Sequence, residues 1–355
     1  KRIKRIMAYT TINKSTDYFN TVLYTGNGST NAITGVGFQP DWVWIKGRSY
    51  IDGHKAYDAV RGVAKDLTPN TTDAEGSTAT GLTAFDSDGF TLGSWSNVNR
   101  SSETHVSWNW KANGQGSSNT DGSINTTYTS VNTTAGFSIS QYTGNESGAP
   151  KTVGHGLGVV PQVVLIKNLA DGTLNWSMYH HKLGNTKVIN LNTTGSESTS
   201  SAYWNNTTPT TSVFTVNSNH SVNHTGTNFI AYCFAEKTGY SQFGSYTGNG
   251  NADGPFIYTG FKPAFLLAKE SSSSGEGWII LDSVRNPGNL VKNSLQANIT
   301  QAEETLTTKS ADFLSNGFKI RTTDGLQNSN GETYIYMAFA EVPLVGTNNI
   351  PALAR

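Results

Sequence analysis

The sequence predicts an all-β fold made of three tandem β-sandwich repeats of a jelly-roll or lectin-like kind. Three observations predict it: the 355 residues are rich in Gly, Asn, Ser and Thr, their apolar runs are short, and a set of phrases returns three times along the chain. Gly, Asn, Ser and Thr are weak helix formers and favour turns. Turn signals that separate short strands about every 8 to 12 residues are typical of a β-sandwich.

The repeat is identified by landmarks that keep their order. The run "YTGNG" at 24–28 returns as "YTGNE" at 142–146 and as "YTGNG" at 246–250. A proline precedes a lysine by six residues in every copy, at Pro40 and Lys46, Pro161 and Lys167, and Pro263 and Lys269. Each copy closes with an aromatic-rich run: "HVSWNWKA", "FIAYCFAE" and "YIYMAFAE". Self-similarity with a period of roughly 100 to 120 residues indicates one structural unit written three times.

These landmarks divide the chain into predicted segments. They are an N-terminal extension at 1–16, repeats at 17–113, 135–238 and 239–343, and a C-terminal tail at 344–355. The stretch 114–134 is rich in Gly, Ser, Asn and Thr, so it is either a flexible linker or, because "SINTTYTSVN" alternates β-branched residues, an added edge strand. Residues 1–6 precede Met7, which has the character of a natural initiator, so they are expected to be either an upstream extension of the reading frame or a remnant of an expression vector. The three modules are expected to lie end to end.

Within each copy the strands follow in a fixed order. The first ends in the "YTGN" corner, where Gly and Asn are expected to supply positive φ. "PDWVWIKG", "VVLIKN" and "FLLAKE" are apolar on both faces and open near a proline, which suits interior strands. "FDSDGFTLG" predicts a hairpin around Asp-Gly. The residues expected in the cores of the modules are Trp42, Trp44, Trp108, Trp110 and the single cysteine, Cys233. "ITQAEETLTTKSADFL" at 299–314 has the strongest helical character.

The bulk composition argues against several classes of partner. Lysine and arginine total 25, aspartate and glutamate total 25, and the formal net charge is zero. Without a basic face or a recognisable binding motif, nucleic acid is not an expected partner. A single cysteine allows no intrachain disulfide. The chain has no apolar run long enough to insert into a membrane, and no cofactor motif is found.

Two polar pairs repeat at the end of a predicted strand. Asp58 and Arg61 lie in "DAVRG", and Asp282 and Arg285 lie in "DSVRN". His180 stands at the matching place in the second copy. An acid that becomes histidine in one copy argues against a shared reaction, so we predict structural ion pairs and no catalytic residue.

Other polar groups are assigned to turns and surfaces. Asp86 and Asp88 have calcium-like spacing, but the other two copies lack both acids, so we predict a turn. His220 and His224 are four residues apart in a segment with the character of a loop, so no metal site is predicted. The acids available to a glycosidase show no spacing that selects a pair: Asp58, Asp86, Asp88 and Glu103.

Two tryptophans are the candidate carbohydrate-binding residues. Trp95 in "LGSWSNVN" and Trp204 in "AYWNNT" are flanked by Ser and Asn, as in a loop. Exposed aromatic rings can stack on the faces of sugars, while neighbouring amides donate to hydroxyls. The alternative for both side chains is packing between modules.

Several phrases resemble repeat domains of uncharacterised tail-fibre or structural proteins in the particles of marine tailed bacteriophages. They include "YTGNGSTNAITGVGFQPDWVWIKGRS", "LTAFDSDGFTLGS", "VGHGLGVVPQVVLIKN" and the terminal "PALAR". The resemblance covers nearly the whole chain and implies a virion protein made in the host cytoplasm, but no catalytic residues.

The resulting expectation is a non-enzymatic tail fibre or similar appendage that contacts host-surface glycan. Expected partners are other virion proteins, further copies of the chain in a homo-oligomer such as a trimer, and the glycan. The alternatives are a capsid decoration or tail-assembly protein and a polysaccharide-degrading enzyme. Repetition of weak sites would raise avidity.

Overall fold

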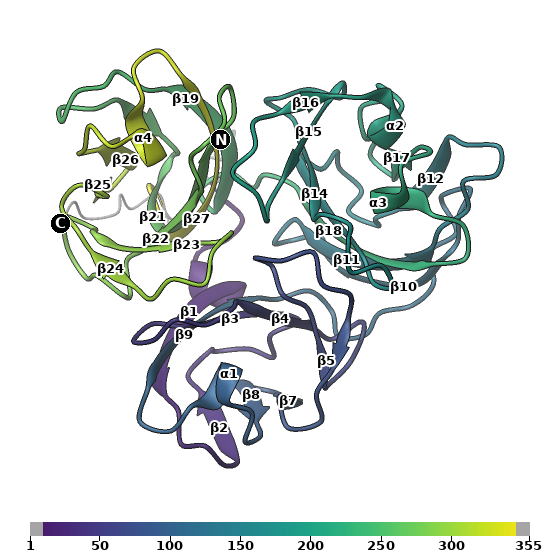
Figure 1. Ribbon diagram of the computed structural model, residues 1–355, viewed down its shortest axis with the longest axis horizontal. Coiled ribbons are helices and arrows are strands. Elements are labelled where there is room, and N and C mark those ends of the chain that lie inside the picture. The colour runs from purple at the N-terminus through teal and green to yellow at the C-terminus, as the bar shows by residue number, and fades with distance from the viewer. Residues whose placement is uncertain (1–9, 346–355) are drawn as a thin grey trace, which may run out of the picture.

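The computed structural model describes residues 10–345, which are all-β, with 27 strands, one 3-10 turn η1 (Ser15–Asp17) and four single-turn α-helices. Figure 1 shows three lobes around a common centre. We call them the first lobe (19–112, purple to blue), the second lobe (113–235, teal) and the third lobe (236–345, green to yellow). The expectation that the modules lie end to end is therefore wrong, for a reason that the cores explain below.

The first lobe has two main antiparallel sheets and a short ribbon. Its elements are β1 (Phe19–Thr25), β2 (Asn31–Thr34), β3 (Trp42–Gly47), β4 (Lys55–Asp58), β5 (Lys65–Asp66), β6 (Gly76–Ser77), β7 (Leu82–Asp86), β8 (Gly89–Leu92), α1 (Ser96–Asn99) and β9 (Thr104–Trp110). The large sheet has the order β1-β9-β3-β4, the small sheet has the order β2-β8-β7, and β5 pairs with β6.

The second lobe has the widest sheet. Its elements are β10 (Thr126–Asn132), β11 (Phe137–Thr143), β12 (Lys151–Gly154), β13 (Val163–Asn168), β14 (Ser177–His180), β15 (Lys187–Asn190), β16 (Ser198–Thr199), α2 (Ser201–Trp204), β17 (Val213–Val216), α3 (His220–Asn223) and β18 (Asn228–Phe234). The large sheet has the order β10-β11-β18-β13-β14-β15-β16, and the small sheet is β12-β17. β10 lies in the stretch 114–134 and is the edge strand beside β11.

The third lobe completes the set. Its elements are β19 (Ser241–Thr247), β20 (Phe256–Tyr258), β21 (Phe261–Glu270), β22 (Trp278–Asp282), β23 (Asn293–Gln296), β24 (Glu304–Thr305), β25 (Ala311–Leu314), β26 (Gly317–Ile320), α4 (Gly325–Asn328) and β27 (Thr333–Pro343). The sheets are β19-β27-β21-β22-β23-β24 and β20-β26-β25. The segment 299–314 forms β24 and β25 and no helix, because Ala311 and Phe313 alternate into the apolar cluster below the sheet.

The large sheets share one strand order and one register. β1-β9-β3-β4 corresponds to β11-β18-β13-β14 and to β19-β27-β21-β22. The tyrosine of the "YTGN" corner lies opposite the second residue of the closing strand in each lobe, as Tyr24 with His105, Tyr142 with Phe229 and Tyr246 with Tyr334. Equivalent positions can therefore be compared from lobe to lobe.

Alternating side chains divide the apolar interior into two kinds of core. Val43 and Ile45 of β3 face a cluster confined to the first lobe. Trp42 and Trp44, one residue out of step, face a central cluster to which all three lobes contribute. The second and third lobes have their own local clusters as well. Because each large sheet is apolar on both faces, its inner face must be covered by the other two lobes, and this forces the three-way arrangement.

The four tryptophans that were expected in the cores of single modules are buried, but they lie in the core that the three lobes share. Trp42, Trp44, Trp108 and Trp110 are each at most 3% exposed. Cys233 is buried as predicted, in the cluster of the second lobe.

Aromatic contacts in the central core join different lobes. The Trp42 and Tyr232 rings are stacked with centroids 4.6 Å apart, and Phe19 stacks on Phe339 at 5.2 Å. The Phe234 and Phe339 centroids are 6.0 Å apart in an edge arrangement. Such pairs add about 0.5–1.5 kcal/mol each beyond their area of burial. Together these contacts connect the first lobe to both others and the second lobe to the third.

The start of the described chain also enters the central core. Ile12 is 1% exposed within it, and the ring of Tyr18 lies 6.1 Å from that of Tyr240. The part of the predicted N-terminal extension from residue 10 to residue 16 is therefore integrated into the fold. The predicted upstream extension at 1–6 and nearly all of the C-terminal tail lie outside the described residues.

The "YTGN" corner ties the first strand of a lobe to its single-turn helix. The hydroxyl of Tyr24 donates to the carbonyl of Val98 at 2.7 Å, and the backbone N–H of Asn27 donates to Oδ1 of Asn99 at 2.9 Å. A Cβ at Gly26 would lie 2.1 Å from the carbonyl oxygen of the residue that follows α1. The expected reason for this glycine was wrong: Gly26 is absent from the positive-φ positions and is required for close approach of the backbone.

The other lobes repeat this corner. The tyrosine bonds are Tyr142 to Val222 at 2.6 Å and Tyr246 to Gln327 at 2.9 Å, and the asparagine bonds are Asn145 to Asn223 and Asn249 to Asn328, both at 2.8 Å. The phrase returns because each lobe needs the same tie.

The three repeated lysines are buried, and each forms a hydrogen bond with a neighbouring lobe. Lys46, Lys167 and Lys269 are each 0% exposed. Their ammonium groups donate across lobe boundaries: Lys46 to the carbonyl of Thr300 at 3.3 Å, Lys167 to that of Thr72 at 2.8 Å, and Lys269 to that of Thr194 at 3.5 Å. Burial lowers the pKa of each lysine to about 8.

These lysines predict a stability that rises with pH. The unfolded lysine pKa is about 10.4, so from about pH 8 to that value the unfolded chain binds more protons than the folded chain. Raising the pH from about 7 to about 9.5 should therefore increase the free energy of unfolding by up to about 2 kcal/mol for each lysine. Urea unfolding across this range measures the increase. Cys233 and the buried tyrosines partly oppose it, because burial raises their pKa values and only their unfolded forms begin to ionise here.

A variant isolates the lysine contribution. Lys167→Met should remove up to about 2 kcal/mol of the pH-dependent increase, whereas Lys14→Met, at a side chain that is 67% exposed, should leave it unchanged. A free energy of unfolding that falls over this range, or a slope that Lys167→Met does not alter, would contradict the assignment.

Candidate functional site

The repeated acid of the first lobe belongs to a buried contact with the second lobe. The Asp58 carboxylate accepts from Nε of Arg61 at 2.6 Å and from the hydroxyl of Tyr232 at 2.8 Å. Nη1 of Arg61 also donates to Glu75 at 3.2 Å. Burial lowers the pKa of Arg61, but Asp58, Tyr232 and Glu75 together raise it by more, so the guanidinium stays charged. The ion pair therefore holds the polar tip of a central-core aromatic ring from a neighbouring lobe.

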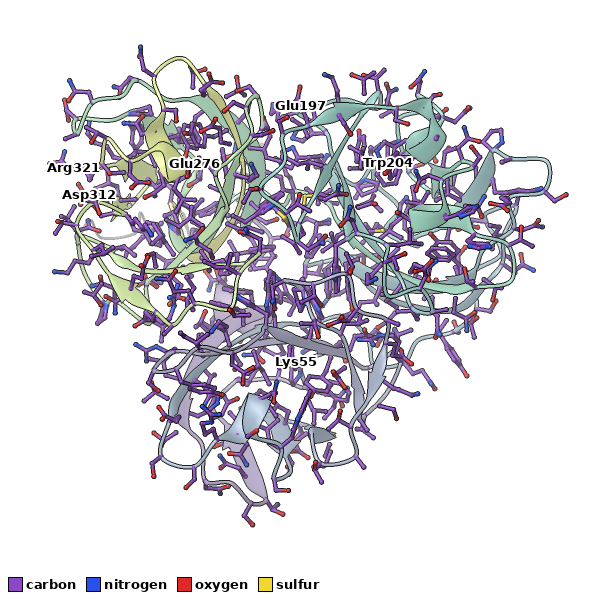
Figure 2. The ribbon with its side chains drawn as sticks, in the orientation of Figure 1. Lys55, Glu197, Trp204, Glu276, Asp312 and Arg321 are labelled. Carbon is purple, nitrogen blue, oxygen red and sulfur yellow. The ribbon has the colours of Figure 1, made fainter. Side chains whose placement is uncertain are left out.

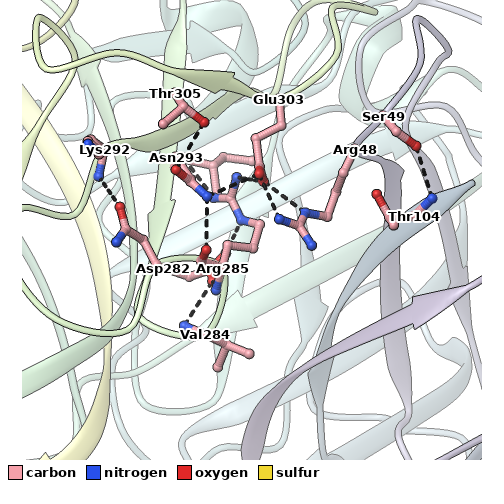
Figure 3. A network of polar contacts seen from close by, with 12 residues as sticks. Arg48, Ser49, Thr104, Asp282, Val284, Arg285, Lys292, Asn293, Glu303 and Thr305 are labelled. Atoms are coloured by element: carbon pink, nitrogen blue, oxygen red, sulfur yellow. Dashed lines mark hydrogen bonds and ion pairs between the residues drawn. The ribbon is translucent and has the colours of Figure 1, made fainter.

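The acid of the third lobe does the same for the first lobe. Asp282 is paired with Arg285 and accepts from the indole N–H of Trp108 at 3.0 Å. Figure 3 shows how the network continues into the first lobe: Arg285 donates to Glu303 at 3.0 Å, and Glu303 also accepts from Arg48 of the first lobe at 2.7 Å. Burial raises the pKa of Glu303, yet the two arginines lower it by more, so it stays anionic.

The second lobe explains why His180 replaces the acid. Trp108, Tyr232 and Met337 occupy equivalent positions, opposite Trp44, Leu165 and Leu267 respectively. Met337 has no hydrogen-bond donor, so the second lobe needs no carboxylate at the position of His180. Instead Nε2 of His180 lies 3.3 Å from the carbonyl of Tyr336, and burial lowers the pKa of His180 to about 3. The histidine is therefore neutral, and the three sites are structural.

The two candidate tryptophans differ from the expectation. Trp204 is 2% exposed, lies inside the second lobe (Figure 2), and donates to the carbonyl of Lys187 at 2.9 Å. The assignment of Trp204 to carbohydrate binding is therefore wrong, because α2 turns this ring inward while its Ser and Asn neighbours face out. Trp95 is half-buried against the local core, and the ammonium of Lys55 sits 4.6 Å from its ring centroid. A ligand role for Trp95 stays a prediction.

The third lobe exposes an aromatic pair that the sequence analysis missed. Phe256 is 45% exposed and Tyr258 is 53% exposed, while Ile257 between them is buried. Both rings therefore stand on the outer face of β20. The search for tryptophan in loops overlooked them, although "PFIYTG" alternates aromatic residues where the other lobes have "NAITG" and "KTVGHG".

Charged groups lie beside this aromatic pair. Phe256 is opposite Lys319 in the strand register, and Lys319 pairs with Asp253 at 2.9 Å. Arg321 contacts both Asp253 and Asp312, each at 3.4 Å, and Figure 2 shows Arg321 and Asp312 at the outer rim of the lobe. The hydrogen bond from Lys319 lowers the pKa of Asp253, so donors and an anionic acceptor flank the rings.

The match to one family of sequences spans all three lobes. A profile for a domain of unknown function, DUF7483, matches residues 14–343. The chain belongs to the DUF7483 family. None of the curated proteins matches this DUF7483 chain. Over residues 10–345 the DUF7483 fold contains no helix of the length and apolarity that crossing a membrane requires.

The buried ion pairs of this DUF7483 protein predict a large loss in the free energy of unfolding when one charged partner is made neutral. Asp282→Asn should lower the free energy of unfolding by about 3–5 kcal/mol, because it leaves the Arg285 charge buried without its main partner. Asp86→Asn, at an exposed position, should change it by less than about 0.5 kcal/mol. Urea unfolding of the three proteins measures both values. A loss below about 1 kcal/mol for Asp282→Asn would show that the pair does not hold the lobes together.

Proposed function

We propose that this protein is a non-enzymatic bacteriophage virion protein, a tail fibre or similar appendage, that contacts host-surface glycan through the third lobe. The observation that carries the proposal is the exposed pair Phe256 and Tyr258 on one face of β20. The phage setting rests on the resemblance of the sequence phrases to virion proteins. In the same proposal the three lobes are copies of one jelly-roll or lectin-like sandwich, which their common strand order and register support.

The aromatic pair is small, so it suits a sugar better than it suits the large apolar surface of a protein partner. Alternate residues of a strand stand about 6.8 Å apart, so the two rings offer a short platform on which sugar faces can stack. Asp253, Lys319 and Arg321 supply charged hydrogen-bonding groups next to it. An apolar platform with a few polar groups at its margin is the usual composition of a small-ligand site.

The acids considered for a polysaccharide-degrading enzyme are engaged in other contacts. Asp58 is in the buried pair with Arg61, Asp88 accepts from backbone N–H groups of the β2–β3 connection, and Glu103 accepts from Ser49. A glycosidase needs two carboxyl groups about 5–10 Å apart across a cleft. This favours binding without hydrolysis.

A broad hollow on the third lobe also lacks such a pair. Its volume is about 780 Å³, and among the described residues that line it Glu341, which is paired with Lys262 at 2.7 Å, is the one acid.

Matched substitutions from the first lobe test the proposal. Ala32 and Thr34 stand where Phe256 and Tyr258 stand, since Ile33 and Ile257 both pair with the phenylalanine of the facing strand. The double variant Phe256→Ala/Tyr258→Thr should therefore fold normally and lose about tenfold or more in affinity for host glycan. A glycan array and a host-cell adsorption assay with the purified chain measure the loss.

A control variant distinguishes binding at this site from non-specific binding to exposed apolar side chains. Leu306→Thr removes a side chain that is 41% exposed in the same lobe and should leave binding unchanged. Glycan binding that survives the double variant would refute the site. Absence of binding by the unmodified chain, with the protein located over the capsid lattice, would favour the capsid-decoration alternative.

A further inference from the structure

The "YTGN" corner of the second lobe brings together a carboxylate and two imidazoles. Nε2 of His220 lies 3.3 Å from a carboxylate oxygen of Glu146, and the His220 and His224 rings are stacked with centroids 4.1 Å apart. One ligand atom from each residue lies within 4.8 Å of the others. The segment taken for a loop contains the helical turn α3, and this turn stacks the two histidines.

The position of these groups is set by the rigid frame of the corner. The N–H of Asn145 donates to Oδ1 of Asn223 at 2.8 Å, and Gly144 lies so close to the end of α3 that a Cβ there would be 2.3 Å from the carbonyl oxygen of His224. Glu146 directly follows the tied asparagine. Its backbone N–H donates to the hydroxyl of Thr225 at 3.1 Å, so the glutamate is also anchored next to the histidines.

The same frame in the other lobes carries no such group. At the positions of Glu146, His220 and His224 the first lobe has Gly28, Ser96 and Arg100, and the third lobe has Gly250, Gly325 and Ser329. The corner forms in all three lobes, so the fold does not require the three ligating residues. All three occur together in one lobe, and this coincidence points to a ligand.

Two imidazoles and one carboxylate suit a transition-metal ion that is borderline between hard and soft, such as Zn²⁺. Imidazole nitrogen and carboxylate oxygen bind Zn²⁺ at about 2.0–2.2 Å, and two histidines with one glutamate is an established zinc-ligand set. Nδ1 of His224 is shielded from solvent, and within the described residues it has no hydrogen-bond partner. A polar atom in that situation ordinarily has one. Small side-chain rotations would bring the three donors to the spacing of a tetrahedral site.

We propose that Glu146, His220 and His224 form a Zn²⁺ site on the surface of the second lobe. Three protein ligands leave a fourth position for water or for a donor from a partner. The ion would tie the end of β11 to α3 from outside, next to the Asn145–Asn223 bond. The site is independent of the aromatic pair on the third lobe, so either can fail without the other.

Calorimetric titration of the full chain with Zn²⁺ tests this site. We expect one ion per chain. Replacing the ligands by the residues of the first lobe, as His220→Ser and His224→Arg, should weaken binding at least about a hundredfold for the double variant, and so should Glu146→Gln combined with His220→Ser. The fold should survive, because the first lobe forms the same corner with Ser96 and Arg100.

The matched control is Glu341→Gln. Its side chain is 32% exposed, like that of Glu146, and its carboxylate pairs with Lys262 in the third lobe. Zn²⁺ binding should be unchanged in this variant, and Co²⁺ in the unmodified chain should give the visible absorption of a tetrahedral ion. Equal Zn²⁺ affinity in the unmodified chain and the His220→Ser/His224→Arg variant would overturn the proposal, and so would the absence of binding to the unmodified chain.

Discussion

The apolar interior shared by the three large sheets is the constraint on which the rest of the structure depends. Each large sheet has apolar side chains on both faces, and one lobe alone can cover only one of them. The rings of Trp42, Trp110 and Phe339 lie where all three inner faces meet. The space left among them is about 10 Å³, at the lower limit for one water molecule. A lobe separated from the others would expose this surface, so we expect the three lobes to fold as one unit, in keeping with a family match that spans all of them.

Closing this interior removes polar groups from water at its rim, and each lobe pairs one backbone N–H there with a neighbouring lobe in the same rotational sense. The backbone N–H of Glu75 donates to Leu169, that of Glu197 to Ser271, and that of Glu303 to Arg48. Ring nitrogens at or just before the start of β4, β14 and β22 run in the opposite sense, as Trp176 to Thr68, Trp278 to Asn190 and His54 with Gln296. With the buried lysines, these contacts make the lobe boundaries specific as well as apolar. A polar group left unpaired there would cost about 1–3 kcal/mol, so a shift in register between lobes is strongly disfavoured.

Much of this architecture could be predicted from alternation and repetition, and the errors have identifiable causes. The period of two correctly indicates strands that are buried on both faces, but it does not say whether the second face is covered by the same module or by another, and the tryptophans of β3 were therefore placed in the wrong core. Trp204 was misjudged because a single helical turn can direct one ring inward among polar neighbours. Gly26 was recognised as necessary for the wrong reason, since contact with a segment more than seventy residues away is invisible in a local pattern.

Three copies of one frame in a single chain separate what the fold requires from what it merely permits. A residue that recurs in every lobe, such as Asn99 with its counterparts, is explained by the bonds it makes in each. A residue that differs in one lobe needs a local cause, and His180 has one, because it meets the carbonyl of Tyr336, next to Met337, where the other lobes present a side-chain donor. Phe256 and Glu146 have none: the matching residues of the other lobes support the same backbone without an aromatic ring or a carboxylate. Since the fold does not account for these two departures, they are the positions at which we propose ligand binding.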